Sequence, residues 1–442
     1  MTEYIKNGKT VLATITKVEG GSGGIGYKLS LRLDCYETDL DDAEDTTSER
    51  TDDTKVFVTG IIVRNMFGMF SYTLDIFNDL TLLHAMNGGG KTTILRLLNA
   101  IINDSFTSIG YVPLDEYTVK FSNGARITLK GNNQEESYSI CFKFPKKHIA
   151  PSDTNYKVGD TIPVNDPQVK SLIKFCTGSL HVKLVAANRL YDLSAEDLNG
   201  QERVIVCADK IQSSVHNAKD VFTQISETLD SSFLYRVMED IIDHKECFTW
   251  EDCNRRNAAL EEQRDRYAQY GLVNSRERHS NSTVSFDVNA TTSTDTLHMI
   301  TTYVRDGETK NKMITDVYDR IGLLLDMINN EHAFCMKKLI IDFSKPNPVY
   351  FETANALHVP LEKLSSGEKN DFILFTELVF DTNASTLVLI DEPEISLHPA
   401  WQLLIVDELM KIGNLNNFQT IVATHSPNIV NDHWDRTVGL EV

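Results

Sequence analysis

The chain has 442 residues, with 43 lysine and arginine residues against 63 aspartate and glutamate residues, so its formal net charge is −20 at pH 7. Such a surface repels a phosphate backbone on average, so broad nucleic-acid binding is not expected, although a local basic groove is compatible with the total. The chain lacks a run of about 18 apolar residues, and its start, MTEYIKNGKT, lacks the apolar segment of a signal peptide. These features predict a cytoplasmic protein without a membrane span. Seven scattered cysteines without a CxxC pair favour reduced thiols over a disulfide framework or a zinc site.

The N-terminal residues 1–55 predict a β-hairpin followed by an acidic loop. Residues 11–19 and 27–33 alternate apolar and polar side chains on either side of a glycine cluster. The cluster matches GxGxxG, but a dinucleotide site requires a helix after the glycines and here a second strand follows. Residues 37–53 are too charged to pack, which predicts a disordered loop.

Residues 56–144 predict strands around an amphipathic helix. Strands are expected at 56–63, 70–77, 80–86, 117–121, 125–130 and 137–144. After the third strand come a glycine-rich turn and a helix whose apolar residues fall on one face: Ile94, Leu97, Leu98, Ile101 and Ile102. That face is expected to pack on a sheet.

Residues 145–336 have the texture of long helices and predict a mostly helical insertion, with a polar linker near 280–296. Residues 337–442 return to β texture, with strands expected at 339–344, 349–353, 386–390 and 420–424. The predicted fold is therefore α/β, with a helical insertion between two halves of one head.

The segment Asn87, Gly88, Gly89, Gly90, Lys91, Thr92 and Thr93 follows a strand and opens the amphipathic helix, as a phosphate-binding loop does. Glycines let backbone N–H groups turn toward phosphates, and the helix N-terminus adds partial positive charge. Lys91 would contact the phosphates of ATP, and the Thr92 hydroxyl would be a ligand of Mg²⁺. Ala85 stands where the motif has its first glycine, and it fits if its φ is negative.

Two adjacent carboxylates end the apolar strand 387–390. Neighbouring residues of a strand point to opposite faces, so Asp391 and Glu392 should have different roles. Asp391 would hold Mg²⁺ through water or Thr92, whereas Glu392 would orient and deprotonate the attacking water. Strands often end in acids, so this pair gains its weight from the phosphate loop upstream and from Pro393.

A second helix start and a histidine complete the set of motifs. Ser365, Gly367 and Glu368 precede an apolar helix, either as an ordinary N-cap or as a site that attracts the phosphate of a nucleotide held by a second copy. His425 follows the last core strand, either as a core histidine or as a contact to a γ-phosphate oxygen.

In this order, the segments AMNGGGKTT, LSSGEK, LVLIDEPEISLHP and ATHSP resemble the motifs of ABC-type ATPases of the SMC, RecF and OLD group. The resemblance implies an ABC-type head that binds ATP and Mg²⁺ and forms at least a dimer. The resemblance also implies that Ser365 and Gly367 contact the γ-phosphate bound by the other subunit. It further implies that Glu392 is the catalytic base and that His425 is the switch residue. His398 stands where transporter-type members carry aspartate, which disfavours a transporter subunit. The chain between Asn103 and Phe121 lacks a glutamine for the Mg²⁺-contacting role, which stays unassigned.

A narrower resemblance rests on residues 64–76, 183–193, 229–239 and 424–442, which are similar to stand-alone ATPases of phage-defence loci, first those of the PARIS type and then the Septu type. The resemblance implies a sensor or scaffold that holds a separate toxic effector, a nuclease, and releases it when a phage-encoded trigger is sensed. Only 17 residues follow His425, too few for the nuclease domain of OLD proteins. The alternative function is a DNA repair ATPase that clamps DNA, which the acidic charge disfavours.

Overall fold

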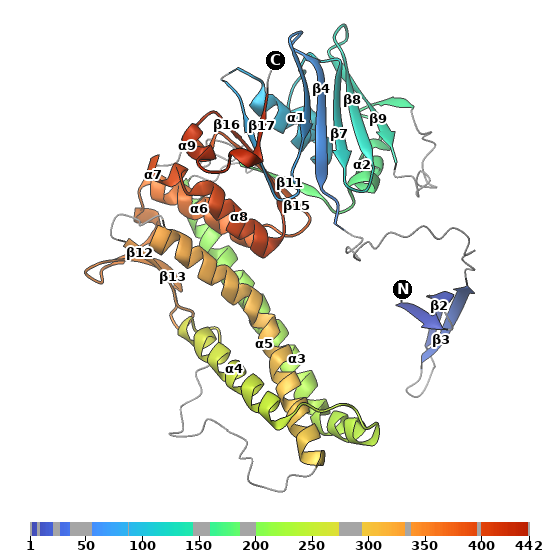
Figure 1. Ribbon diagram of the computed structural model, residues 1–442, viewed down its shortest axis with the longest axis vertical. Coiled ribbons are helices and arrows are strands. Elements are labelled where there is room, and N and C mark those ends of the chain that lie inside the picture. Colours follow the sequence, from blue (N-terminus) through green and yellow to red (C-terminus); the bar gives the residue numbers. More distant parts are fainter. Residues whose placement is uncertain are drawn as a thin grey trace. The chain divides into compact units, whose positions relative to one another are not determined.

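Figure 1 shows the chain as a computed structural model that divides into two compact units, residues 1–53 and 54–442. The structure describes residues 2–6, 9–20, 27–35, 55–86, 88–144, 160–185, 200–273, 294–331, 337–395 and 399–440.

The first unit is a three-stranded antiparallel sheet in the order β1-β2-β3. Its strands are β1 (Thr2–Lys6), β2 (Lys9–Gly20) and β3 (Tyr27–Cys35). The pairing of β2 with β3 confirms the predicted hairpin, and β1 adds a third strand. The acidic segment predicted to be disordered, 37–53, lies outside the described residues.

The second unit contains a six-stranded antiparallel sheet in the order β10-β9-β8-β7-β4-β5. Its strands are β4 (Val58–Met66), β5 (Phe70–Asp75), β7 (Glu116–Phe121), β8 (Arg126–Asn132), β9 (Ser137–Lys143) and β10 (Thr161–Pro163). Buried and more exposed residues alternate along β8 and β9, as expected for a sheet with one face in the core. Helix α2 (Val169–Thr177) follows this sheet in the chain.

A five-stranded parallel sheet, in the order β11-β15-β16-β6-β17, forms the centre of the unit. Its strands are β6 (Leu80–His84), β11 (His181–Val185), β15 (Thr386–Asp391), β16 (Gln419–Thr424) and β17 (Thr437–Gly439). Leu389 belongs to the core on one face and Val388 to the core on the other. Burial on both faces explains why these strands read as continuous apolar runs in the sequence.

Helix α1 (Lys91–Asn103) belongs to the core on the side of the antiparallel sheet, and α6 (Ser366–Phe380) and α8 (Ile405–Asn416) to the core on the other side. All five residues of the predicted apolar face of α1 are buried, and Tyr117 of β7 donates a hydrogen bond to the Ile94 carbonyl oxygen at 2.9 Å. The shorter helices are η1 (Phe106–Ser108), η3 (Leu361–Lys363), η4 (Pro393–Ile395), α7 (Pro399–Gln402), α9 (Pro427–Val430) and η5 (Trp434–Arg436).

Gln419 connects the two large sheets. Its side chain accepts a hydrogen bond from Val58 N at 2.9 Å and donates to the carbonyl oxygens of Val58 and Phe77, each at 2.7 Å. The amide is buried, so these three bonds satisfy polar groups that water cannot reach. These bonds fix the start of β16 against β4. They thereby join the parallel sheet, which carries the motifs, to the antiparallel sheet.

Three long helices project from the head: α3 (Gly200–Ile242), α4 (Trp250–Gln269) and α5 (Thr294–Asp326). Figure 1 shows α3 and α5 running side by side, and Arg236 joins them by two hydrogen bonds of 2.7 Å to the Asp306 carboxylate. α4 packs closely on α5 at Gly307, where a Cβ would lie 2.8 Å from a methyl group of Leu260. The π-helix η2 (Met327–Glu331) ends the insertion, and β12 (Lys337–Ile341), β13 (Val349–Thr353) and β14 (His358–Val359) form a small antiparallel sheet.

The boundary of the insertion differs from the sequence prediction. The sequence assigns 145–336 to the insertion, but β10 pairs with β9 and β11 with β15, so the described residues 160–185 belong with the head. The long helices begin at Gly200. The predicted α/β class with a long helical insertion is confirmed, and the strands separate into an antiparallel sheet and a parallel one.

Ion pairs fasten the insertion to the head. Arg203 of α3 contacts Glu377 of α6 at 2.9 Å, and Lys210 of α3 forms an ion pair with Asp381, the residue that caps α6. Lys183 of β11 contacts both carboxylates, at 3.2 and 3.1 Å. The end of α6 is therefore held directly on the root of α3.

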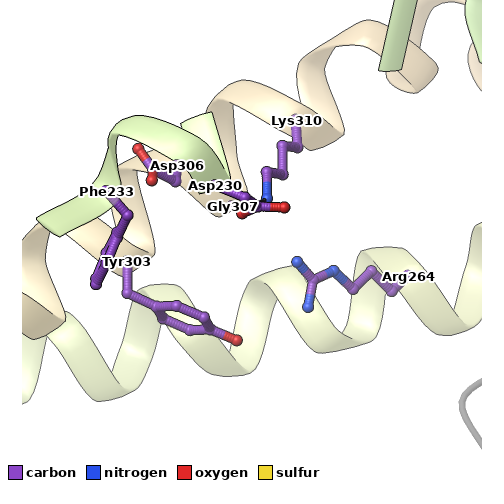
Figure 2. Close-up of a pocket in the computed structure, with 7 residues that line it drawn as sticks. All are labelled: Asp230, Phe233, Arg264, Tyr303, Asp306, Gly307 and Lys310. Atoms are coloured by element: carbon purple, nitrogen blue, oxygen red, sulfur yellow. Dashed lines mark hydrogen bonds and ion pairs between the residues drawn. The ribbon is translucent and has the colours of Figure 1, made fainter. Parts of the chain in front are cut away.

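The three long helices line a hollow of about 230 Å³ (Figure 2). Lys310 contacts Asp230 at 2.7 Å, and Arg264, which enters from α4, contacts Glu261 at 3.0 Å. Because its charged side chains form ion pairs with one another or with neighbours, we assign the hollow to helix packing rather than to ligand recognition.

Within the described residues, Cys141, Cys176, Cys207, Cys247 and Cys253 form no disulfide. Burial raises the pKa of Cys176 and of Cys207 to about 12, which makes both unreactive. Among the described helices, none combines the length and the apolar character that crossing a bilayer requires.

Candidate functional site

The predicted motifs meet at one edge of the parallel sheet. Strands β15, β16 and β6 are neighbours and end in register, with Asp391 opposite Ala423 and Thr424 opposite His84. The glycine-rich loop follows β6, the two carboxylates end β15, and His425 follows β16. Ligands of parallel α/β sheets bind outside the carboxyl ends of the strands, so this edge is the candidate site.

The loop before α1 needs its glycines. Gly88 and Gly90 have φ angles of 86° and 81°, which residues with a Cβ rarely adopt. A Cβ on Gly90 would also lie 2.5 Å from the terminal methyl group of Met66. Ala85 is buried and is absent from the described residues with positive φ, so it replaces glycine there as the sequence predicts. Asn87 lies outside the described residues.

Lys91, the first residue of α1, turns its side chain back toward this loop. Its ammonium donates hydrogen bonds to the carbonyl oxygens of Ala85 at 2.9 Å and Met86 at 3.2 Å, and the residue is only 4% exposed. A buried ammonium bonded only to neutral carbonyls is well placed to interact with an anion. The helix start contributes further partial positive charge at the same place.

Thr92 and Asp391 come together from positions 299 residues apart, the hydroxyl donating to the carboxylate at 3.1 Å. Burial raises the pKa of Asp391, and nearby Glu392 acts in the same direction, while the hydrogen bond from Thr92 opposes them. A cation would relieve this burial penalty. The described residues contain no cluster of three or more histidine, cysteine or acidic side chains suited to a metal ion. One hydroxyl and one carboxylate nevertheless fit Mg²⁺, which takes few protein ligands and completes its shell with water and phosphate oxygens.

Glu392 adopts a strained backbone immediately after β15. Its φ is 48°, in the left-handed region that non-glycine residues seldom occupy, and its N–H donates to the Ala423 carbonyl oxygen at 2.8 Å. Its carboxylate lies 3.8 Å from Nδ1 of His425 and is partly exposed. The two residues predicted to act on water and on the γ-phosphate are thus neighbours. Thr93, also predicted to contact nucleotide, is half-buried in the first turn of α1.

Glu394 is a residue that the sequence reasoning missed. It lies on η4, and one of its oxygens, Oε1, accepts hydrogen bonds from Thr424 Oγ1 and from His425 N, each at 2.9 Å, and lies 2.8 Å from His425 Nδ1. The available signal was a second acid two residues beyond Glu392 in the segment LVLIDEPEISLHP.

The second predicted helix start has the geometry of a capping box. Ser365 caps α6 by accepting from Glu368 N at 3.3 Å, while Glu368 Oε2 accepts from Ser365 N at 2.8 Å. Lys337 also donates to both oxygens of Glu368 at 2.9 Å. Burial disfavours the charged form of Glu368, but the bonds from Lys337 and Ser365 outweigh it and lower the pKa.

The predicted contact of Glu368 with a nucleotide stays a prediction. Both of its carboxylate oxygens are engaged inside the chain, so the side chain of Glu368 supports the start of α6. Gly367 differs, because a Cβ there would meet nothing within 4 Å. The fold of this chain alone does not require glycine at that position. His398, the residue that separates this chain from transporter-type sequences, lies outside the described residues.

One protein family, described as the AAA ATPase domain, matches residues 57–430. Among curated proteins, the Retron Ec83 probable ATPase of Escherichia coli is 26% identical over 151 residues, a match that covers 28% of this chain and 28% of that protein. The similarity thus spans less than a third of the relative's length.

Two archaeal head structures show a distant likeness. The Smc head domain with an extended coiled coil from Pyrococcus furiosus, bound to the C-terminal domain of ScpA, is 14% identical with a TM-score of 0.39, covering 87% of this chain and 93% of that chain. The Smc head domain with a coiled coil and joint from Pyrococcus yayanosii is 11% identical with a TM-score of 0.37, covering 87% and 95%. At these scores the likeness assigns neither function nor partner.

Proposed function

The chain belongs to the AAA ATPase domain family, and from that premise we propose that it binds ATP with Mg²⁺ and hydrolyses it where β6, β15 and β16 end. The observation that carries the proposal is the hydrogen bond between Thr92 and Asp391, which joins the phosphate loop to the strand with the two carboxylates. A structural role alone would not require a buried lysine, a hydroxyl and a carboxylate at one strand edge.

Each residue of the site has a distinct role in this proposal. The N–H groups of the glycine loop and the ammonium of Lys91 bind the phosphates. Thr92 and Asp391 would hold Mg²⁺, which neutralises charge on the phosphate oxygens when bound. Glu392 orients the attacking water and accepts its proton.

We further propose that two copies share each site, with Ser365 and Gly367 of one copy facing the γ-phosphate bound by the other. Helix geometry leaves the N–H groups of Ser366 and Gly367 without a partner inside the helix, and the open space beside Gly367 leaves room for a phosphate to approach the backbone. Glu368 supports this role by accepting a hydrogen bond from Ser365 N, and Lys337 supports it by donating to the Glu368 carboxylate.

The biological role that we propose is an ATP-dependent sensor and scaffold in antiphage defence, which holds a separate effector protein, a nuclease, and releases it when a phage-encoded trigger is sensed. The similarity to the Escherichia coli retron ATPase supports this role, although it covers a small part of both chains. The ion pairs between α6 and α3 also support it, because they give nucleotide-dependent movement of α6 a direct route to the insertion.

The distal end of α3 presents a surface suited to a protein partner. Four large apolar side chains there are between 66% and 74% exposed: Leu234, Tyr235, Met238 and Ile242. They lie away from α5, which is contacted by Arg236 on another face of the helix. The exposed residues Glu239 and Asp243 lie next to these four side chains. We therefore propose that the effector binds here through apolar side chains of its own that are bordered by lysine or arginine.

Co-purification with the products of the neighbouring genes tests this docking surface. We expect one such product to bind the tagged wild-type chain and to be lost from the double variant Met238→Glu, Ile242→Glu, because two buried carboxylates would oppose an apolar contact. Val221→Glu, at an exposed position nearer the head, is the matched control and should retain the partner. Equal retention by both variants would contradict the docking surface.

Titration with duplex DNA tests the alternative of a DNA clamp. A clamp that contacts several phosphates loses about 10³-fold or more in affinity between 50 and 200 mM salt. The exposed acidic residues Glu239 and Asp243 of α3 predict weak DNA binding at both salt concentrations. Tight, ATP-dependent binding with that steep salt dependence would favour the DNA repair function instead.

A further inference from the structure

We propose that Glu394 is a positioning residue for His425, holding the imidazole by Nδ1 so that Nε2 is the nitrogen presented to the bound nucleotide. This inference rests on the proposed ATPase function, and it adds a residue to which neither the sequence motifs nor the comparisons assign a role. Glu394 acts through His425 and has no direct contact with the reacting atoms in this assignment.

Glu394 contacts both the backbone and the ring of the same histidine. The single oxygen Oε1 accepts a hydrogen bond from His425 N at 2.9 Å and another from Thr424 Oγ1 at 2.9 Å, and the same atom lies 2.8 Å from Nδ1 of the imidazole. Because the backbone N–H and the ring Nδ1 of His425 both contact the same oxygen, the imidazole cannot rotate freely about its side-chain bonds. The end of β16 and the imidazole are thereby locked to η4.

Glu394 itself is firmly placed. Its side chain is 7% exposed, and its carbonyl oxygen accepts a hydrogen bond from Gln402 Nε2 at 3.2 Å. Gln402 in turn accepts from Ser426 Oγ at 3.3 Å, so both sides of His425 are tied into one network. Among the residues that the structure describes, no donor contacts the second oxygen of Glu394, which is buried. All the anchoring therefore passes through Oε1.

The two glutamates near His425 consequently divide the work. Glu392 lies 3.8 Å from Nδ1, too far for a hydrogen bond, and its carboxylate is more exposed, so it is free to engage water. The Glu394 carboxylate is close to Nδ1 and buried, so it is shielded from water but can fix the orientation of the imidazole. A carboxylate 2.8 Å from Nδ1 decides which nitrogen carries the proton, as in other carboxylate–histidine pairs.

Kinetics of Glu394→Ala and Glu394→Gln, with a histidine nuclear magnetic resonance spectrum, test the assignment. Glu394→Ala should lower kcat for ATP hydrolysis by about 10- to 10²-fold with little change in KM, because a misplaced catalytic group costs that much. Glu394→Gln keeps a carbonyl oxygen as acceptor and should recover most of kcat. In nitrogen-15 spectra of the nucleotide-free wild type at alkaline pH, His425 should carry its proton on Nδ1, and Glu394→Ala should shift it toward Nε2.

Thr177→Val is the control, because it removes a buried hydroxyl that donates to the Ile173 carbonyl oxygen in α2, outside the site. It should lower the melting temperature but leave kcat and the tautomer of His425 unchanged, which separates positioning from general stability. Full kcat in Glu394→Ala, or a wild-type His425 protonated on Nε2, would overturn the inference. If Glu394→Ala fails to fold, the wild-type spectrum and Glu394→Gln decide. A wild type that hydrolyses no ATP would instead contradict the proposed function, while its spectrum would still test the Glu394–His425 contact.

Discussion

Replacing Glu392 by glutamine is expected to slow ATP hydrolysis by about 10²- to 10⁴-fold, the loss typical for a missing general base, while ATP still binds. The substitution keeps the shape of the side chain and removes its ability to accept a proton. Glu392 has a strained φ of 48° at the end of β15, and its carboxylate lies beside His425. Such strain is typical of functional sites, so we expect the side chain at this position to serve catalysis. Phosphate release and nucleotide affinity, measured separately, distinguish catalysis from binding.

Glu362→Gln is the matched control for that experiment, because Glu362 is an exposed glutamate on η3 outside the site. It should hydrolyse ATP as the wild type does. Full turnover by Glu392→Gln would move the base to another residue, and loss of ATP binding in that variant would show that Glu392 serves mainly to shape the pocket.

Replacing Lys91 by alanine is expected to abolish measurable nucleotide binding. The variant loses the positive charge that interacts with the phosphates, and a charge-assisted contact in a partly buried site is worth far more than one at the surface. The side chain is buried and bonded to the carbonyl oxygens of Ala85 and Met86, so its removal also loosens the loop. Calorimetric titration with ATP and Mg²⁺ measures the effect.

Lys130→Ala removes an exposed lysine of β8 and should bind ATP with unchanged affinity. Lys91→Met, which keeps most of the side-chain length, guards against simple collapse of the loop, and thermal melting verifies that each variant is folded. ATP binding of wild-type strength in folded Lys91→Ala would show that the phosphate-loop assignment is wrong.

Much of the head could be predicted from the sequence because local patterns coincide with tertiary burial there. The apolar residues of α1 are spaced for one helical face, the helix after Ser365 is apolar, and the apolar residues of both helices are buried as expected. The run before Asp391 is apolar throughout because β15 is buried on both faces. Glycine spacing also predicted the loop before Lys91, since φ values near 80° at Gly88 and Gly90 allow few other residues.

The features that could not be predicted depend on contacts between distant segments. His181–Val185 has no local signal that separates it from the insertion, and it joins the head only through parallel pairing with β15. Glu368 lies in a motif but is turned inward by Lys337, which is 31 residues away in the chain. The role of Glu394 likewise depends on the chain folding back to place Thr424 and His425 beside it.

Mixing two inactive variants tests most directly whether two copies share each ATP site. Lys91→Ala lacks a working phosphate loop, and Ser365→Arg blocks the start of α6, so each alone should hydrolyse no ATP. Melting curves should show both variants folded, since losing the Ser365 cap costs only about 0.5–2 kcal/mol. A mixed pair contains one intact site, formed by the loop of the Ser365→Arg copy and the helix start of the Lys91→Ala copy, so activity should return on mixing. Full activity of Ser365→Arg alone, or continued inactivity of the mixture with mixed pairs present, would contradict a shared site.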